Sequence, residues 1–123
     1  MKTFATFAIL LLGLALEPSA QSIRRMLINA DYTFYSENFE DAIHLYEAVL
    51  TRRPESDKAM YHKMIAEYMT VKRTEDVTPL IDFYKDASAS DRFFHYWMDR
   101  IYLGQYNFHH AREHFKTFAI VAL

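Results

Sequence analysis

Residues 38–46 read NFEDAIHLY and residues 107–115 read NFHHAREHF, so both follow the pattern N-F-x-x-A-x-x-x-aromatic. The two stretches lie 69 residues apart (107 minus 38). This separation is close to twice a period of about 34 residues, which is typical of chains built from stacked helical hairpins. A further copy of the unit is therefore expected between them.

The apolar residues that begin in the first stretch recur at helical spacing. Counted from Phe39, apolar side chains follow at Ala42, Ile43, Tyr46, Val49 and Leu50. The intervening polar residues are Glu40, Asp41, His44 and Glu47. An apolar stripe with polar residues opposite it indicates an amphipathic helix with one buried side.

The copies after the first are less regular. Ala30-Asp31-Tyr32 reappears as Ala66-Glu67-Tyr68, and Val77, Leu80, Ile81 and Tyr84 supply an apolar face to the helix that follows. The third unit has two registers, one using Gly104 and Tyr106 and the other using Phe108 and Ala111. We prefer the second register because it retains Phe115 and the spacing to the first unit.

Composition favours a single all-α domain. The chain has 123 residues, 51% of them hydrophobic, and only two glycines and three prolines for the tight turns of an all-β fold. Its formal charge is −2 and its acids and bases are mixed, so no basic stripe is present for nucleic acid. It contains no cysteine and therefore no disulfide.

Helices are expected over about 23–36, 39–53, 57–71, 75–87, 91–104 and 107–122. Asp57 and Ser90 precede apolar helical segments as N-cap candidates, and Thr78-Pro79 places a proline in a first turn. Arg52 and Arg53 followed by Pro54 indicate a helix end.

In these features the chain resembles the tetratricopeptide repeat (TPR) family over about residues 23–123. The resemblance implies three antiparallel hairpins, at about 23–54, 57–88 and 91–123, stacked in a short right-handed solenoid. The first unit carries the signature best, with Ala30 at the close approach of two helices and Phe39, Ala42 and Pro54 in the second half. It departs from the family at Glu37, where a turn glycine is usual.

Residues 1–22 have the layout of a secretory signal peptide: Lys2, an apolar run over 3–16, then Pro18 and small residues. That run is short of the roughly 20 residues needed to span a bilayer. Cleavage after Ser22 and cleavage after Ala20 both remain open, as does an uncleaved anchor or buried helix. We expect an exported protein of the periplasm or cell envelope, not transmembrane after cleavage.

Residues 110–114 read H-x-x-E-H, the pattern of an inverted zinc-peptidase motif. His110 and His114 have the spacing of neighbours on one helical face, and Glu113 would serve as the base. The chain, however, ends nine residues later, whereas the third ligand is expected well downstream. Because Ala111 and Phe115 hold the core positions of the repeat, we expect the two histidines on a partly exposed flank and no metal there.

The chain carries no nucleophile elbow, P-loop or dinucleotide fingerprint, so we expect no enzyme and no cofactor. The resemblance implies a scaffold or adaptor that binds a peptide or a partner's helix in a concave groove. The candidate groove residues are Asp31, Tyr35, Lys63, Glu67, Tyr96 and Arg100. Two alternatives remain: these charges form salt bridges between hairpins, or the His-rich last helix makes a small metal-dependent enzyme or metal-binding protein.

The last residues, 118–123, read FAIVAL and are apolar throughout. Repeat arrays ordinarily finish with a polar capping face, so we expect this end to be covered by a further helix or domain, a second copy or a partner. A signal peptide followed directly by degenerate repeats also resembles the N-terminal region of modular cell-envelope proteins.

Overall fold

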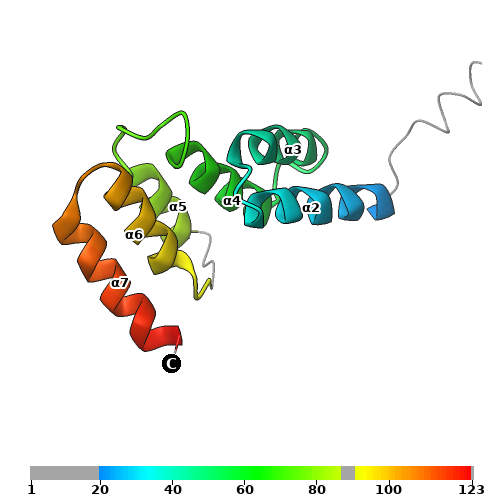
Figure 1. Cartoon of the computed structure of the whole chain (residues 1–123). Helices are drawn as coiled ribbons and strands as arrows, with labels where there is room; N and C mark the ends of the chain where they lie inside the picture. The colour runs from blue at the N-terminus through cyan, green and yellow to red at the C-terminus, as the bar shows by residue number, and fades with distance from the viewer. Residues whose placement is uncertain (1–19, 87–90, 123) are drawn as a thin grey trace, which may run out of the picture.

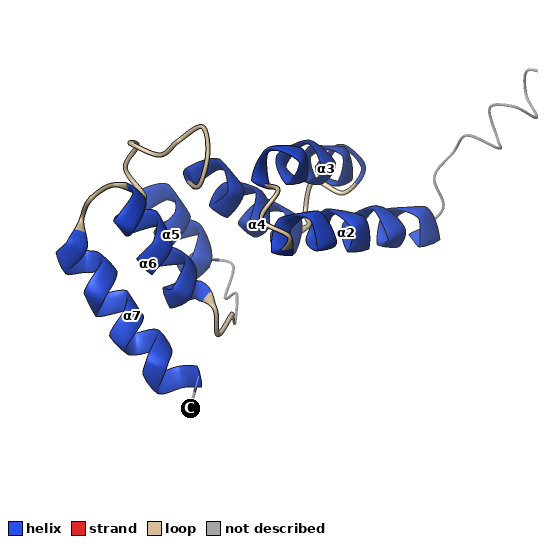
Figure 2. Ribbon diagram, in the orientation of Figure 1, coloured by secondary structure: helices blue, strands red, loops and turns tan. Residues whose placement is uncertain are grey.

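The computed structural model describes residues 20–86 and 91–122, and all the regular structure in those ranges is helical (Figure 2). The helices are α2 (Ala20–Tyr35), α3 (Phe39–Arg52), α4 (Asp57–Tyr68), α5 (Thr78–Asp86), α6 (Phe94–Gly104) and α7 (Phe108–Ala122). The prediction of an all-α chain with six helices is confirmed for this part of the chain. No helix within it is long and apolar enough to cross a membrane. Most of the expected signal peptide lies outside the described residues.

Two helical hairpins lie at opposite ends of the molecule (Figure 1). One consists of α2 and α3 and the other of α6 and α7, and in each the two helices pack closely against one another. Helix α4 lies between them and packs against α3 and, less extensively, α2. Helix α5 has nine residues and is the shortest, and its Tyr84 ring stacks on Phe94 of α6 at 3.8 Å between centroids.

The turn between α2 and α3 depends on a left-handed residue. Glu37 has φ 63°, a conformation that glycine adopts more easily than other residues. Its N–H donates to the Phe34 carbonyl at 2.9 Å, and the Asn38 N–H donates to the Thr33 carbonyl at 3.1 Å. This pair of bonds satisfies the last carbonyls of α2 and is the usual way of ending a helix at a left-handed residue.

The turn between α6 and α7 repeats this geometry bond for bond. Tyr106 has φ 58°, its N–H donates to the Leu103 carbonyl at 3.0 Å, and the Asn107 N–H donates to the Tyr102 carbonyl at 2.8 Å. Each of these residues lies 69 positions after its counterpart in the first turn. The preferred register of the third unit, which aligns Asn107 with Asn38, is therefore correct for the backbone.

The predicted apolar stripe of α3 is buried except for Leu50, which is partly buried, and the polar residues predicted opposite it are exposed. Small residues sit where helices approach closely: Ala30, Ala42, Ala66 and Ala111 are all buried. The largest fully buried side chains are Tyr46, Phe34, Ile65, Leu80, Met98, Ile101 and Val49. Phe34 of α2 lies 4.9 Å from Trp97 of α6 between ring centroids, so this core joins the first hairpin to the last.

Several helix boundaries and caps differ from the prediction. The N-cap of α4 is Ser56 rather than Asp57, because the Ser56 hydroxyl accepts the Ala59 N–H at 3.3 Å. Helix α5 begins at Thr78 rather than near residue 75, with Pro79 in its first turn as predicted, because the Asp76 carboxylate accepts the Thr78 N–H at 3.0 Å. Helix α6 begins at Phe94, and Ser90, the expected cap, lies outside the described residues.

The prediction of which residues of the last helix are buried is partly wrong. Ala111 is buried as predicted, but Phe115 and Phe108 are exposed, and the half-buried residues that face α6 include His114 and Phe118. Among the described helices, α7 packs extensively only with α6, which leaves Phe108 and Phe115 on an exposed side of α7.

Candidate functional site

An aromatic pocket of about 270 Å³ opens between the two terminal hairpins. Its lining residues come from the end of α2 and the turn after it, the start of α6, and α7: Tyr35, Glu37, Phe93, Tyr96, Trp97 and Phe118. Residues far apart in the sequence thus form one site. Aromatic side chains in a shared concavity are the residue types that dominate protein-recognition hot spots.

The rings form a continuous wall. Phe118 of α7 lies 5.4 Å from Tyr96 and 6.0 Å from Phe93 between centroids, and Tyr96 packs edge-on against Trp97 at 5.0 Å. Trp97 itself is buried, and its indole N–H has no hydrogen-bond acceptor among the described residues. Tyr35 is exposed at the rim. The pocket therefore has a wall of packed rings and an accessible aromatic edge.

Arg100 connects the pocket to the first hairpin. Its guanidinium lies over the rings of Tyr96 (5.8 Å) and Trp97 (5.6 Å) and forms an ion pair with Glu37 across the two hairpins. Burial by itself lowers the pKa of Arg100, but the Glu37 carboxylate and Tyr96 raise it above its ordinary value. The cation is therefore held in place by the rings and by the carboxylate.

Asp31 has a different environment from the one expected of a groove residue. Its carboxylate accepts the Tyr46 hydroxyl at 2.5 Å, lies 3.0 Å from the Lys58 ammonium and 3.5 Å from Nδ1 of His62. Burial raises the pKa of Asp31, but these three partners outweigh it and lower the pKa to about 2. Asp31 thus joins α2, α3 and α4, as the salt-bridge alternative expects.

Lys63 and Glu67 also pair within the protein. The Lys63 ammonium lies 3.7 Å from the Glu67 carboxylate one turn away on α4, and Lys72 lies 3.7 Å from the same carboxylate. Of the six candidate groove residues, the structure brings Tyr35 and Tyr96 into one pocket with Arg100 against it. The other three, including Asp31, are engaged in ion pairs elsewhere.

The histidines of the last hairpin pair across helices. Nδ1 of His95 lies 2.7 Å from Nδ1 of His114, and the two rings stack at 4.9 Å between centroids. Burial lowers the pKa of both, and nearby His95 and His110 lower that of His114 further. His110 instead contacts the Asn107 side chain at 3.0 Å and is exposed. Among the described residues, no group of three or more histidines or carboxylates is arranged to hold a metal ion.

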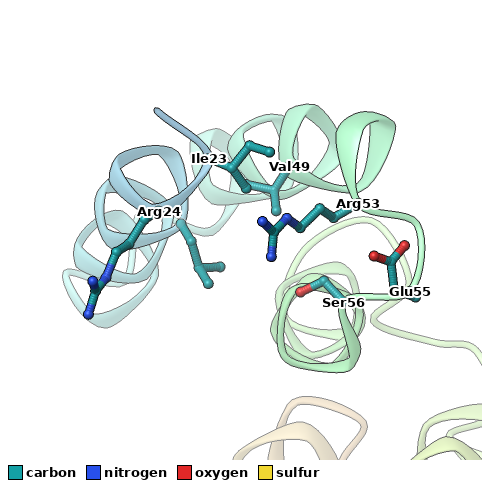
Figure 3. A pocket seen from close by; sticks show the side chains of 7 residues that line it. Ile23, Arg24, Val49, Arg53, Glu55 and Ser56 are labelled. Carbon is teal, nitrogen blue, oxygen red and sulfur yellow. The ribbon is translucent and has the colours of Figure 1, made fainter. Parts of the chain in front are cut away.

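A second cavity, of about 470 Å³, lies at the N-terminal end of the first hairpin (Figure 3). Its walls are aliphatic and charged: Ile23, Arg24, Leu27, Val49, Arg53, Glu55 and Ser56. Arg53 reaches into the space between α2 and the start of α4, whereas Arg24 points away from it. The cavity holds no ring against which a ligand would stack, so the aromatic pocket is the better candidate for recognition.

Sequence reasoning missed the pocket residues Phe93, Trp97 and Phe118. Their only sequence signal is the clustering of aromatic residues at 93–97 and the recurrence of one at 118. It also missed the partnership of His95 with His114, because those residues lie on different helices and share no motif spacing.

Comparisons with protein-family models, with curated proteins and with solved structures found no match for this chain.

Proposed function

We propose that this protein is a non-catalytic scaffold of TPR type that binds an extended peptide segment of a partner protein in the aromatic pocket. The single observation that carries the proposal is the convergence of five aromatic residues from three helices and a turn on one accessible concavity. No covalent chemistry is required of such a site, since affinity comes from burying apolar surface and from aromatic anchoring.

The repeat architecture supports the comparison with TPR proteins. The two turns with identical backbone bonds lie 69 residues apart, close to two periods of about 34 residues. Helices α4 and α5 occupy the place of the middle unit, although α5 is short. In such arrays, stacked hairpins produce extended surfaces that bind peptides.

The size of the pocket favours a side chain as its occupant. At about 270 Å³ it lies below the roughly 300–1,000 Å³ that is usual for small-molecule and cofactor sites. One bulky apolar side chain of a peptide would contact Tyr96, Trp97 and Phe118. The Arg100–Glu37 pair beside it offers one donor and one acceptor for the polar groups of the same peptide.

Selection from a phage-displayed library of random linear peptides tests this proposal. Peptides enriched on the wild-type chain are expected to share a bulky apolar residue. Their affinity for Tyr96→Ser is expected to fall about tenfold or more, because the substitution removes a central ring of the pocket. Fluorescence anisotropy of the synthesised peptides provides the affinities.

The matched control is Tyr106→Ser, which also removes an exposed tyrosine ring but lies outside the pocket. Affinity for this control is expected to equal that of the wild type. The pocket would be excluded as the recognition site if the peptides bound Tyr96→Ser as tightly as the wild type. It would also be excluded if the wild type enriched peptides no more strongly than Tyr96→Ser does.

We further propose that the chain is exported to the periplasm or cell envelope by cleavage of an N-terminal signal peptide. The support is the layout of residues 1–22 in the sequence. A scaffold in that compartment would hold partner proteins in an assembly.

A further inference from the structure

The common turn geometry makes positions 69 residues apart equivalent in the two terminal hairpins. In the first hairpin, one side of α3 is covered by later helices. Tyr46 lies 5.7 Å from the His62 ring of α4, and Phe39 lies 6.1 Å from the Trp97 ring of α6. Between these two, Ile43 is also buried.

The equivalent side of α7 is uncovered. Phe108 and Phe115 correspond to Phe39 and Tyr46, yet their exposed fractions are 64% and 56% against 8% and 0%. Leu103, which corresponds to the fully buried Phe34, is 45% exposed. The same backbone geometry therefore carries large apolar side chains that in one hairpin are core and in the other face solvent.

We propose that this side of α7, formed by Phe108, Arg112, Phe115 and Ala119 and called the α7 face below, binds an amphipathic helix of a partner protein. The helix carries a carboxylate between two bulky apolar residues. The proposal concerns a surface other than the aromatic pocket and does not depend on peptide binding there.

The first hairpin shows why the occupant is a helix. Helix α4 packs along α3, and its His62 ring lies against Tyr46, the counterpart of Phe115. A helix in the same relation to α7 would meet side chains at positions 108, 112, 115 and 119. These positions have the i, i+4, i+7, i+11 spacing that fits one face of a packed helix.

Charge complementarity shows why the partner helix is acidic. Arg112 stands where the first hairpin has Ile43, and it has no ion pair within residues 20–86 and 91–122. Asp31, which receives Lys58 of α4, is replaced at the equivalent position by Arg100. The first hairpin thus receives Lys58 of the helix that covers it. In the last hairpin Arg100 pairs with Glu37, so Arg112 is the cation that the α7 face presents to its partner.

Arg112 also disfavours a second copy of this chain as the occupant. In an antiparallel two-fold pairing of α7 faces, Phe108 would lie opposite Phe115 of the second copy and Arg112 would lie opposite its own counterpart. Like charges in direct contact across an interface oppose association. The face is therefore better suited to a different, acidic helix.

The test uses two synthetic peptides that copy residues 56–70 of this chain, measured against the full chain by fluorescence anisotropy. One has the natural α4 sequence, and the other carries Lys58→Glu and His62→Glu. The acidic peptide is expected to bind about tenfold more tightly than the natural one, because its new carboxylates attract Arg112, whereas Lys58 of the natural peptide repels it. Arg112→Glu in the protein is expected to reverse this preference, and Phe115→Ser to weaken both peptides.

Arg24→Glu and Tyr32→Ser are the matched controls, since both residues are exposed on α2 at the other hairpin. These two variants are expected to bind as the wild type does, and circular dichroism verifies that every variant remains helical. The proposal is overturned if Arg112→Glu keeps the wild-type preference. It is also overturned if sedimentation shows a dimer of the wild-type chain that Phe115→Ser abolishes.

Discussion

His95 and His114 show how a single pair of side chains makes the packing of two helices depend on pH. The hydrogen bond between their Nδ1 atoms requires one nitrogen to carry a proton and the other to accept it. When both rings are fully protonated, two donors with like charges face one another and the bond is lost. The exposed His110 adds charge nearby, and the Tyr102 ring stacks on His114 at 5.6 Å.

We therefore expect the stability of the wild type to fall between about pH 7.5 and about pH 5. The pKa values of both histidines are lowered in the folded protein, so the unfolded chain binds more protons below the ordinary histidine pKa of about 6.5. This stabilisation is present above that pKa and is lost as the pH falls through the folded values. The free energy of unfolding in urea at each pH measures the fall.

His114→Asn tests the assignment, because its amide can hydrogen-bond to His95 without titrating. The loss of stability on acidification is expected to be smaller in this variant than in the wild type. His109→Asn, on the exposed side of the same helix, should keep the wild-type loss. An unchanged loss in His114→Asn would show that other groups cause the pH dependence.

At the scale of elements, the two αα turns explain how a chain with two glycines makes tight helical connections. Glu37 and Tyr106 adopt positive φ without being glycine, which has an energetic cost for a side chain with a Cβ atom. Glu37 recovers part of that cost through its ion pair with Arg100. Tyr106 forms no such pair, and its ring is exposed.

Tyr106→Gly is accordingly expected to stabilise the protein by about 0.5–1 kcal/mol, because relief of the left-handed strain exceeds the added freedom of the unfolded chain. Urea denaturation measures the change in the free energy of unfolding. Glu37→Gly is the informative comparison, because it relieves the same backbone strain but also removes the ion pair with Arg100. The increase in its free energy of unfolding should therefore be smaller than that of Tyr106→Gly. A loss of stability in Tyr106→Gly would mean that its ring contact with Phe108 matters more than the backbone.

At the scale of the whole molecule, cross-hairpin contacts hold the array together. Phe34 packs on Trp97 and Arg100 pairs with Glu37, so the first and last hairpins meet beside the aromatic pocket. The Asp31 cluster joins α4 to the first hairpin. The pocket therefore exists only while the hairpins keep their mutual positions.

The proposed export is tested on the whole chain. Protein recovered from the periplasmic or envelope fraction of its source is expected to begin at residue 21 or at residue 23, because both sites follow small residues at the end of the apolar run. N-terminal sequencing and the intact mass measure this directly. A chain that retains Met1 in that fraction would contradict cleavage.

The sequence by itself determined the helical class, the order of the helices and the correspondence between the first and last hairpins. The periodicity of residues 38–50 and the N-F-x-x-A pattern are local properties of the chain, and local spacing is what specifies an amphipathic helix. Tyr35, Tyr96 and Arg100 were predicted as binding residues from the resemblance to TPR proteins, which implies that the first helix of each hairpin lines one surface.

Only the tertiary structure decided which of those candidates form a site. Asp31 pairs with Tyr46 and Lys58 of other helices, whereas Lys63 and Glu67 pair with one another on α4 and Glu67 also with Lys72. A half-buried charge is stabilised by such partners. The helical spacing of apolar residues likewise could not decide which side chains of α7 are buried. Phe115 has the pattern of a core residue, but whether it is core depends on whether a following helix covers it, and that is a property of packing rather than of the pattern.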